Sequence, residues 1–345
     1  MKTIKQFQAP DFSIPLQTNW QLSDLAEFKG KQELFTHQAP QKLQALREHA
    51  LIESAVSSNR IEGVEVDRSR IATVVFGAPV YKDRNEEEVA GYRTALNELH
   101  MHTLPPTEKN MLQLHRWCRG QIWDAGQYKD KPVDILEILP NGEQKVRFRS
   151  VSPEETPIMT RQLFATFDEE LKNQRIPPLL LLGALNLDFL CIHPFRDGNG
   201  RVSRLLLLQC CYQLGFDVGR YISLERIIEQ NKERYYETLR QSSEGWHEGR
   251  HTPWPYIGYL LFILKQAYKE FEQRVGELTA PHGEKTARVE RAIQSFPDKF
   301  STASLHQACP GVSIDLVRAT LKRLQEEKKV KCLGKGRSAK WMRLN

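Results

Sequence analysis

The alternation of apolar and polar positions predicts a chain built mostly from helices. Apolar residues recur at helical spacing in residues 42–56, 86–101, 108–122, 154–171, 227–242 and 254–275. Two further segments, 179–192 and 205–214, are apolar almost throughout, which is typical of helices buried on all sides. Residues 1–41 are rich in Pro and Gln with scattered apolar positions, and we interpret them as an arm packed on the body.

Local signals add one helix start and one β-hairpin. Thr107 precedes the helix that begins at Glu108 and can cap its first turn. Residues 133–139 (VDILEIL) and 145–151 (KVRFRSV) read as two strands. The Asn141-Gly142 pair between them suits the tight turn of a hairpin.

A second pattern follows an Ala-Pro-His-Gly linker at residues 280–283. Helical periodicity covers 286–295 and 301–308, and residues 313–327 form a strongly amphipathic segment that Ser313 can cap. The last residues alternate around Gly334 and Gly336, as in a short hairpin. Three helices and a basic hairpin predict a winged helix-turn-helix domain at 285–345.

Composition is that of a soluble globular protein, with 40% apolar and 27% charged residues among 345. No apolar run reaches the roughly 18 to 20 residues that span a bilayer, and the N-terminus lacks the features of a secretory signal. The six cysteines show no CxxC spacing, and Cys210-Cys211 lies inside an apolar run. We therefore expect reduced thiols and a cytoplasmic location, without a membrane partner.

The positive charge of the chain is concentrated in the tail. The net charge is +6, but residues 285–345 contain 14 Lys and Arg against 5 Asp and Glu, a net charge of +9. The first 284 residues therefore carry a net charge of −3. This distribution favours a small basic module attached to a nearly neutral catalytic or binding body.

The most informative stretch lies between the two apolar runs, where residues 193–204 read HPFRDGNGRVSR. Glycines on both sides of Asn199 let consecutive N–H groups point into one concavity at the start of the next helix, a geometry that holds phosphates. Arg201 and Arg204 share a face of that helix and can bind a more distal anion.

Two further residues of the stretch supply chemistry. Asp197 beside a polyphosphate is a natural Mg²⁺ ligand, because this ion takes few protein carboxylates and keeps phosphate and water. His193 can act as a general base near neutral pH. The set of residues points to phosphoryl or nucleotidyl transfer, whereas a helix cap with incidental charges explains each residue only singly.

The stretch also resembles the Fic family signature, HPFx(D/E)GNGRxxR, without a mismatch. The resemblance covers roughly residues 40–275 and implies a helical fold and transfer of AMP from Mg-ATP to a Ser, Thr or Tyr hydroxyl of a protein. The expected divisions are an N-terminal part at 1–105, a Fic core at 106–279 and the winged helix at 285–345.

The resemblance assigns roles by position. It implies that His193 is the base, Asp197 the Mg²⁺ ligand and Arg204 the clamp of the γ-phosphate, while Phe195 anchors the loop in the core. On the adenine side, Tyr235, Tyr236 and Leu239 resemble the family's helix, but Ser243 stands where some relatives have Asn. The ATP-binding set implied is Gly198, Asn199, Gly200, Arg201, Val202, Ser203, Arg204 and Tyr236.

The hairpin at 133–149 resembles the family's flap, where a target segment aligns by adding a strand to an exposed edge. Val133, Asp134 and Ile135 are the candidate residues for this alignment. An ordinary edge hairpin remains the alternative.

A second short motif resembles the family's inhibitory pattern, (S/T)xxxE(G/N), at Ser58, Glu62 and Gly63. It implies that Glu62 pairs with Arg204 and removes the γ-phosphate clamp. The alternative is an ordinary helix end, with a solvated Glu62 and Gly63 as the residue after the C-cap.

Three functions remain open from the sequence. The first is an autoinhibited AMP transferase with ATP and Mg as cofactors. The second is the reverse reaction, in which Glu62 orients water to remove AMP from a modified protein. The third is a transcription regulator with a nucleotide-sensing core, in which Arg318, Lys322, Arg323, Lys335, Arg337 and Lys340 contact DNA. Expected partners are ATP, a target protein, DNA through residues 285–345, and a second copy of the chain in a homodimer.

Overall fold

The structure is a computed structural model that describes all residues except 39, 68, 77–79, 139–142, 280–283, 297–298, 310–311, 335–338 and 345. The chain divides into two compact units, Met1–Phe271 and Glu272–Asn345. The domain boundaries expected from the sequence stay predictions.

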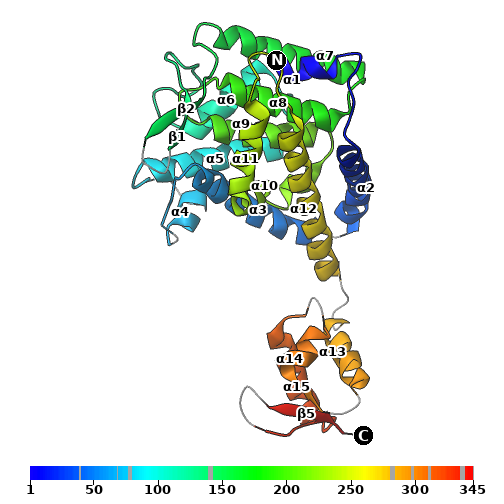
Figure 1. Ribbon diagram of the computed structural model, residues 1–345. Coiled ribbons are helices and arrows are strands. Elements are labelled where there is room, and N and C mark those ends of the chain that lie inside the picture. The colour runs from blue at the N-terminus through cyan, green and yellow to red at the C-terminus, as the bar shows by residue number, and fades with distance from the viewer. Residues whose placement is uncertain are drawn as a thin grey trace. The chain divides into compact units, whose positions relative to one another are not determined.

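The first unit is a helical body with one small sheet (Figure 1). Its elements are α1 (Lys2–Phe7), α2 (Leu16–Gln38), α3 (Pro40–Ile61), α4 (Ile71–Phe76), α5 (Arg84–Met101), α6 (Glu108–Arg119), β1 (Ile135–Ile138), β2 (Gln144–Phe148), α7 (Thr156–Asn173), α8 (Pro178–Ile192), α9 (Asn199–Gln213), a 3₁₀ turn (Asp217–Arg220), α10 (Leu224–Gln230), α11 (Lys232–Ser243) and most of α12 (Trp254–Thr279), whose last residues belong to the second unit.

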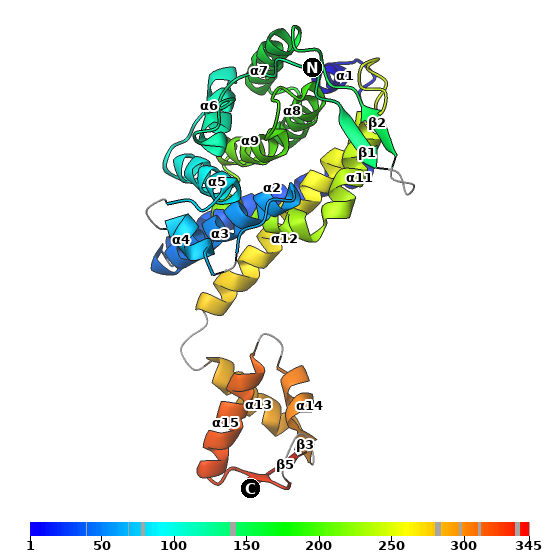
Figure 2. The same ribbon diagram turned by 90° about the vertical axis from the view of Figure 1, so that its left-hand side faces the viewer.

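The core of this unit is built around α8 and α9. Almost every residue of these two helices is buried. The apolar runs 179–192 and 205–214 predict this burial, whereas the polar first turns of α9 do not. Helix α8 packs against α7 and α9, and α9 also packs against α6 (Figure 2). The loop between α8 and α9 therefore starts and ends on two helices that are buried along almost their whole length.

Local signals in the sequence were accurate in some places and not in others. The Thr107 side chain accepts a hydrogen bond from the N–H of Asn110 at 3.2 Å, which confirms the predicted cap of α6. The helix predicted at 227–242 is interrupted at Asn231, which separates α10 from α11. Most of the N-terminal arm is helical, which the sequence pattern did not indicate because the apolar residues of α2 do not gather on one face.

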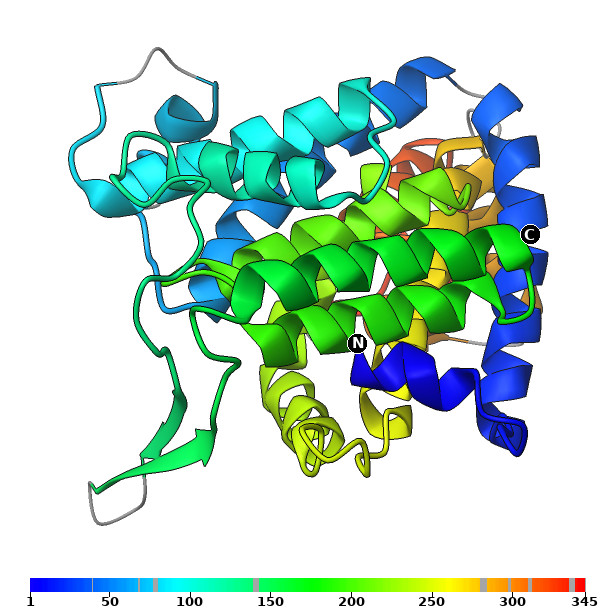
Figure 3. The ribbon, with the colours of Figure 1, turned by 90° about the horizontal axis from the view of Figure 1, so that it is seen from above.

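The predicted hairpin is present, with β1 and β2 paired antiparallel. Figure 3 shows it standing at the edge of the helical body. The turn residues Asn141 and Gly142 lie outside the described residues. Within the described part of the chain, no helix is long and apolar enough to cross a membrane.

The second unit contains α13 (Glu284–Ser295), β3 (Phe300–Ser301), α14 (Thr302–Gln307), α15 (Ile314–Glu326), β4 (Val330–Cys332) and β5 (Lys340–Arg343). The three strands form an antiparallel sheet in the order β3-β5-β4. The unit has its own core, in which Val289, Leu305, Val317 and Leu321 are buried. Ser313 caps α15 as predicted, because its side chain accepts from the N–H of Leu316 at 3.3 Å.

The basic residues proposed for DNA contact are only partly described. Lys335 and Arg337 lie outside the described residues. On α15, Lys322 is exposed, whereas Arg318 pairs with Asp315 and Arg323 pairs with Glu290 and Glu327. The assignment of this unit to the winged helix-turn-helix class, and its binding to DNA, stay predictions.

Candidate active site

The loop between α8 and α9 bends sharply through two left-handed residues. His193 ends α8 with φ 55° and ψ 62°, and Gly198 precedes α9 with φ 84°. Glycine adopts this conformation freely, but histidine does so only at an energetic cost that the surrounding structure must offset. Such strain at a non-glycine residue is characteristic of functional sites, and here it turns the His193 side chain out of the helix.

His193 is held as a neutral imidazole. Burial, together with the nearby charge of Lys129, lowers the pKa of His193 from 6.5 to about 4. Its Nδ1 lies 3.3 Å from the carbonyl oxygen of Leu190. Because a carbonyl oxygen only accepts, this contact favours the tautomer with the proton on Nδ1 and leaves Nε2 able to accept a proton.

Side chains inside and beside the loop fix its shape. The Asn199 amide accepts from the N–H of Phe195 at 2.9 Å and donates to its carbonyl at 2.7 Å. The Phe195 ring is fully buried and stacks on His115 at 3.7 Å between ring centroids, which agrees with its predicted role as an anchor. Lys129, also buried, donates from Nζ to the carbonyl of Ile192 at 3.1 Å. The conformation of the loop is therefore held by contacts within the chain itself.

The Asp197 carboxylate is surrounded by guanidinium groups. Arg119 and Arg84 donate to its Oδ2 at 2.7 and 3.0 Å, and Arg201 donates to its Oδ1 at 3.2 Å. Although burial alone raises it, the charges of Arg201, Arg119 and Arg84 keep the pKa of Asp197 below its usual value. Among the described residues, no group of three or more His, Cys, Asp or Glu side chains forms a metal cluster.

Arg201 lies deeper than the sequence indicated. It is 2% exposed and donates to Glu88 on α5 at 2.7 Å. The other oxygen of Glu88 accepts from Arg119 and Arg84, both at 2.9 Å. Sequence reasoning missed Arg84, Glu88 and Arg119, because nothing in the pattern distinguishes a buried charge on an amphipathic helix from a solvated one. These residues orient the side chains of Asp197 and Arg201.

Arg204 faces the end of α3, at the short inhibitory motif. Its Nη2 lies 2.8 Å from Oε1 of Glu62 and donates to the Ser58 carbonyl at 2.9 Å, and its Nε donates to the Ser58 hydroxyl at 2.8 Å. Gly63 follows with φ 80°, as expected for the residue after a C-cap. The structure therefore contains both features: Gly63 follows the end of the helix, and Glu62 pairs with Arg204.

The Glu62 carboxylate also lies against the start of α9. A Cβ atom at position 200 would collide with Oε1 and the carboxyl carbon of Glu62. Only glycine at this position lets a negative group approach the first turn of α9 so closely. The carboxylate thus occupies the place where the positive end of the helix attracts an anion.

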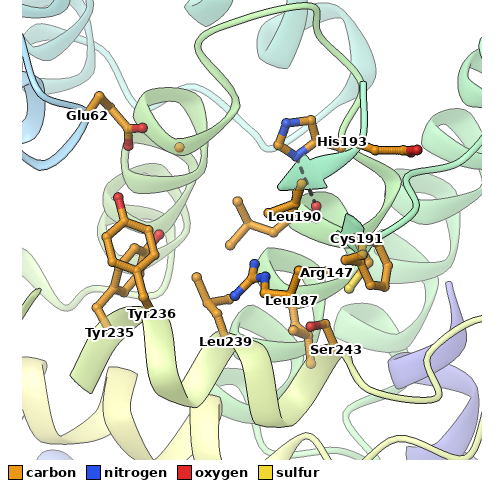
Figure 4. Close-up of a pocket in the computed structure, with 14 residues that line it drawn as sticks. Glu62, Arg147, Leu187, Leu190, Cys191, His193, Tyr235, Tyr236, Leu239 and Ser243 are labelled. Atoms are coloured by element: carbon orange, nitrogen blue, oxygen red, sulfur yellow. Dashed lines mark hydrogen bonds between the residues drawn. The ribbon is translucent and has the colours of Figure 1, made fainter. Parts of the chain in front are cut away.

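A cavity of about 300 Å³ joins these residues to the hairpin and to α11 (Figure 4). Glu62, His193 and Gly200 line one part of it, and Tyr235, Tyr236, Leu239 and Ser243 line another. The volume is at the lower end of the range for small-molecule sites. The hydroxyl of Tyr236 donates to the carbonyl of Ile61 at 3.1 Å, so the aromatic wall also touches the end of α3.

Not every residue implied by the signature faces this cavity. Asp134 and Ile135 of the hairpin line it, and Val133 precedes them outside the lining. Val202 is buried in the core, and the Ser203 hydroxyl donates to the carbonyl of Gly200 at 2.8 Å. In this structure these two residues support the helix start.

Residues 105–211 match the model of the Fic/DOC family. Curated relatives include the protein adenylyltransferase Fic of Nematostella vectensis, 25% identical over 201 residues that cover 54% of this chain and 42% of the relative. That of Drosophila mojavensis is 23% identical over 217 residues, which cover 61% of this chain and 40% of the relative. This chain thus spans about two fifths of the length of these relatives.

Solved structures show the same fold. A Fic family protein from Desulfovibrio desulfuricans aligns with a TM-score of 0.63 at 20% identity, covering 98% of each chain. A Fic domain containing signaling protein from Bacteroides thetaiotaomicron aligns with a TM-score of 0.59 at 22% identity, covering 73% of this chain and 98% of the other.

Proposed function

Since this chain carries a Fic domain at residues 105–211, we propose that it is a protein adenylyltransferase that moves AMP from ATP to a hydroxyl side chain. Its curated relatives are named protein adenylyltransferases. The observation that carries the proposal is that one cavity is lined by the neutral His193, by Gly200 at the start of α9 and by the aromatic residues Tyr235 and Tyr236. Nucleotidyl transfer needs a general base, a binding place for phosphate and a surface for the nucleoside, and these three features can supply them.

In the proposed reaction, the first turn of α9 binds the phosphates of the nucleotide through its N–H groups and its dipole. The nucleoside lies against Tyr236 and Leu239, which line the same cavity. Nε2 of His193 accepts the proton of the target hydroxyl as its oxygen attacks the α-phosphorus, and pyrophosphate leaves. The left-handed backbone of His193 at the end of α8 keeps the imidazole in the lining of the cavity during this step.

The residues present also fit a magnesium ion. Asp197 is 46% exposed, its pKa is lowered, and Mg²⁺ needs only one or two protein carboxylates when phosphate oxygens complete its coordination. Asp197 would hold the ion, which would neutralise charge on the phosphates. Arg84, whose side chain is 59% exposed, can swing away from Asp197 without leaving a buried charge unpaired.

The pair Glu62–Arg204 supports autoinhibition. Arg204 is 2% exposed, and its Nε and Nη2, which could bind a γ-phosphate, are engaged by Ser58 and Glu62. The carboxylate also lies at Gly200, where a phosphate would bind. ATP that binds in this state is misaligned, and a misplacement of about 1 Å costs about 10²-fold in rate.

The proposal is tested by mass spectrometry of the full chain after incubation with Mg-ATP, with and without a cell lysate. Addition of AMP to the chain or to a lysate protein supports it. If the Glu62→Gly chain attaches AMP to no protein, the proposed activity is wrong.

Arg204→Ala is expected to lower AMP transfer by about 10²-fold relative to Glu62→Gly. The substitution removes autoinhibition by Glu62, but it also removes the cation that aligns the distal phosphate. Arg204→Lys keeps the charge and is expected to recover part of the rate, since lysine lacks the paired donors of arginine. Rates with labelled ATP measure both variants. An Arg204→Ala chain as active as Glu62→Gly would contradict the clamp.

The pH dependence follows from the lowered pKa of His193. Because the base must be neutral, transfer by Glu62→Gly is expected to stay level down to about pH 6 and to fall as the pH approaches about 4. A midpoint near 6.5, the usual value, would contradict this.

The pKa values of His100 and His115 are also lowered to about 4, so folding stability decreases as the pH falls from 6.5 toward 4. Circular dichroism at each pH separates unfolding from loss of the base.

DNA binding by residues 285–345 and formation of a homodimer stay predictions. Lys322 is exposed on α15 and supports contact with a phosphate backbone. Such binding would weaken strongly with salt.

A further inference from the structure

The hairpin places one cation in the cavity through a break in its ladder. Ile135 pairs with Phe148 and Leu136 pairs with Val146, so Arg147 has no opposite residue on β1. Such a bulge bends the strand and redirects a side chain. In a regular strand successive side chains point to opposite faces, yet both Arg147 and Phe148 line the cavity. The bulge is what turns Arg147 inward.

Arg147 lines the same cavity as Gly200, the glycine in the first turn of α9. Figure 4 shows its guanidinium between Leu190 and Leu239, below Glu62 and His193 in this view. Its charge partly offsets the effect of burial, which raises the pKa values of the Tyr236 phenol and the Cys191 thiol. Because the nucleoside of the proposed reaction lies against Tyr236 and Leu239 of this cavity, its base comes within reach of the Arg147 guanidinium.

A guanidinium in this place discriminates between bases. Arginine has five N–H donors and no acceptor, so it pairs best with a base edge that offers two acceptors. Guanine presents O6 and N7 on one edge, whereas the matching edge of adenine presents the N7 acceptor beside an amino donor. Ser243 does not discriminate, because a hydroxyl both donates and accepts. The side chains of Leu187 and Leu239, which line the same cavity, are apolar.

We propose that Arg147 is a specificity-determining residue that binds the nucleobase, and that the site takes GTP in addition to ATP. The inference rests on the proposed nucleotidyl transfer and specifies its substrate class. The chemistry is otherwise unchanged, since the attacked α-phosphate and the leaving pyrophosphate are common to both nucleotides.

The test compares ATP and GTP on the full chain carrying Glu62→Gly. Calorimetry gives the two dissociation constants with Mg²⁺, and α-labelled nucleotides give the two transfer rates. Arg147→Gln is the decisive variant, because glutamine pairs with the adenine edge that arginine does not match. We expect it to shift the ratio of GTP to ATP affinity toward ATP by about fivefold or more.

Two further variants separate the causes. Arg147→Lys keeps the charge but loses the paired donors, so it is expected to lower the affinity for GTP relative to that for ATP. Lys145→Gln removes a positive charge two residues away on the same strand, outside the cavity lining, and is expected to keep the ratio.

The outcomes distinguish the inference from the proposed function. If the Arg147→Gln chain transfers AMP and has the same ratio of GTP to ATP affinity as its parent, base recognition by Arg147 is wrong. The proposed transferase activity is then unaffected. A parent chain that binds ATP but gives no measurable binding of GTP also overturns the inference. If neither nucleotide binds or labels protein, the proposed function itself is wrong and the inference falls with it.

Discussion

A Glu62→Gly chain incubated with Mg-ATP is expected to incorporate about 10²-fold more AMP into itself than the native chain. Two effects combine in this variant. Arg204 loses its carboxylate partner at 2.8 Å and becomes available to the γ-phosphate. The start of α9 at Gly200 is also cleared of a negative group that competes with the nucleotide. Labelled ATP followed by gel electrophoresis measures the increase.

Glu65→Gly is the matched control for this experiment. It removes the same side chain from an exposed position in the same connection after α3 and is expected to behave as the native chain. Glu62→Gln separates charge from volume, because it keeps the shape and removes the ion pair. Equal labelling of native and Glu62→Gly chains would refute autoinhibition.

The same pair of proteins tests the reverse reaction. Glu62 is 30% exposed and lines the cavity beside His193, where it could orient a water toward a bound AMP. A modified target that loses AMP to the native chain and keeps it with Glu62→Gly would establish removal as the activity of the resting form.

His193→Ala in the Glu62→Gly background is expected to lower AMP transfer by about 10²- to 10⁴-fold, the usual contribution of a general base. Nucleotide affinity should change little, because in the proposed reaction the imidazole acts on the target hydroxyl. A loss in rate at constant dissociation constant therefore distinguishes a catalytic role from a collapse of the loop. Calorimetry and initial rates provide the two measurements.

The control for this variant is His102→Ala, an exposed histidine just after α5. It is expected to leave rate and affinity unchanged. Full activity of His193→Ala would assign the proton transfer to another group and would contradict the mechanism.

Features that involve only neighbouring residues could be predicted from the sequence. The residues at 193–204 are contiguous, and two apolar helices flank them, so their mutual placement follows from backbone geometry alone. The glycine with positive φ, the helix that begins at Asn199 and the cap at Thr107 are all properties of a few neighbouring residues. For the same reason the end of α3 at Gly63 was predictable.

Features that require distant residues were not predictable in this way. Glu88 reads as a solvated acid near the start of α5, yet it is 3% exposed and binds three arginines. Arg201 reads as a phosphate ligand on an exposed helix turn, yet it is buried against α5. Periodicity predicts which face of a helix is apolar but does not predict which helix will cover its polar face.

The sequence by itself determined the helical class, the hairpin and the composition of the loop, because helix periodicity, strand alternation and the contiguous signature are local. Only the tertiary structure decided that Glu62 lies against Gly200 and that a bulge turns Arg147 into the same cavity. Both depend on the packing of α3 and of the hairpin beside α8 and α9. The free energy of that packing comes from contacts between residues far apart in the chain, which no local pattern records.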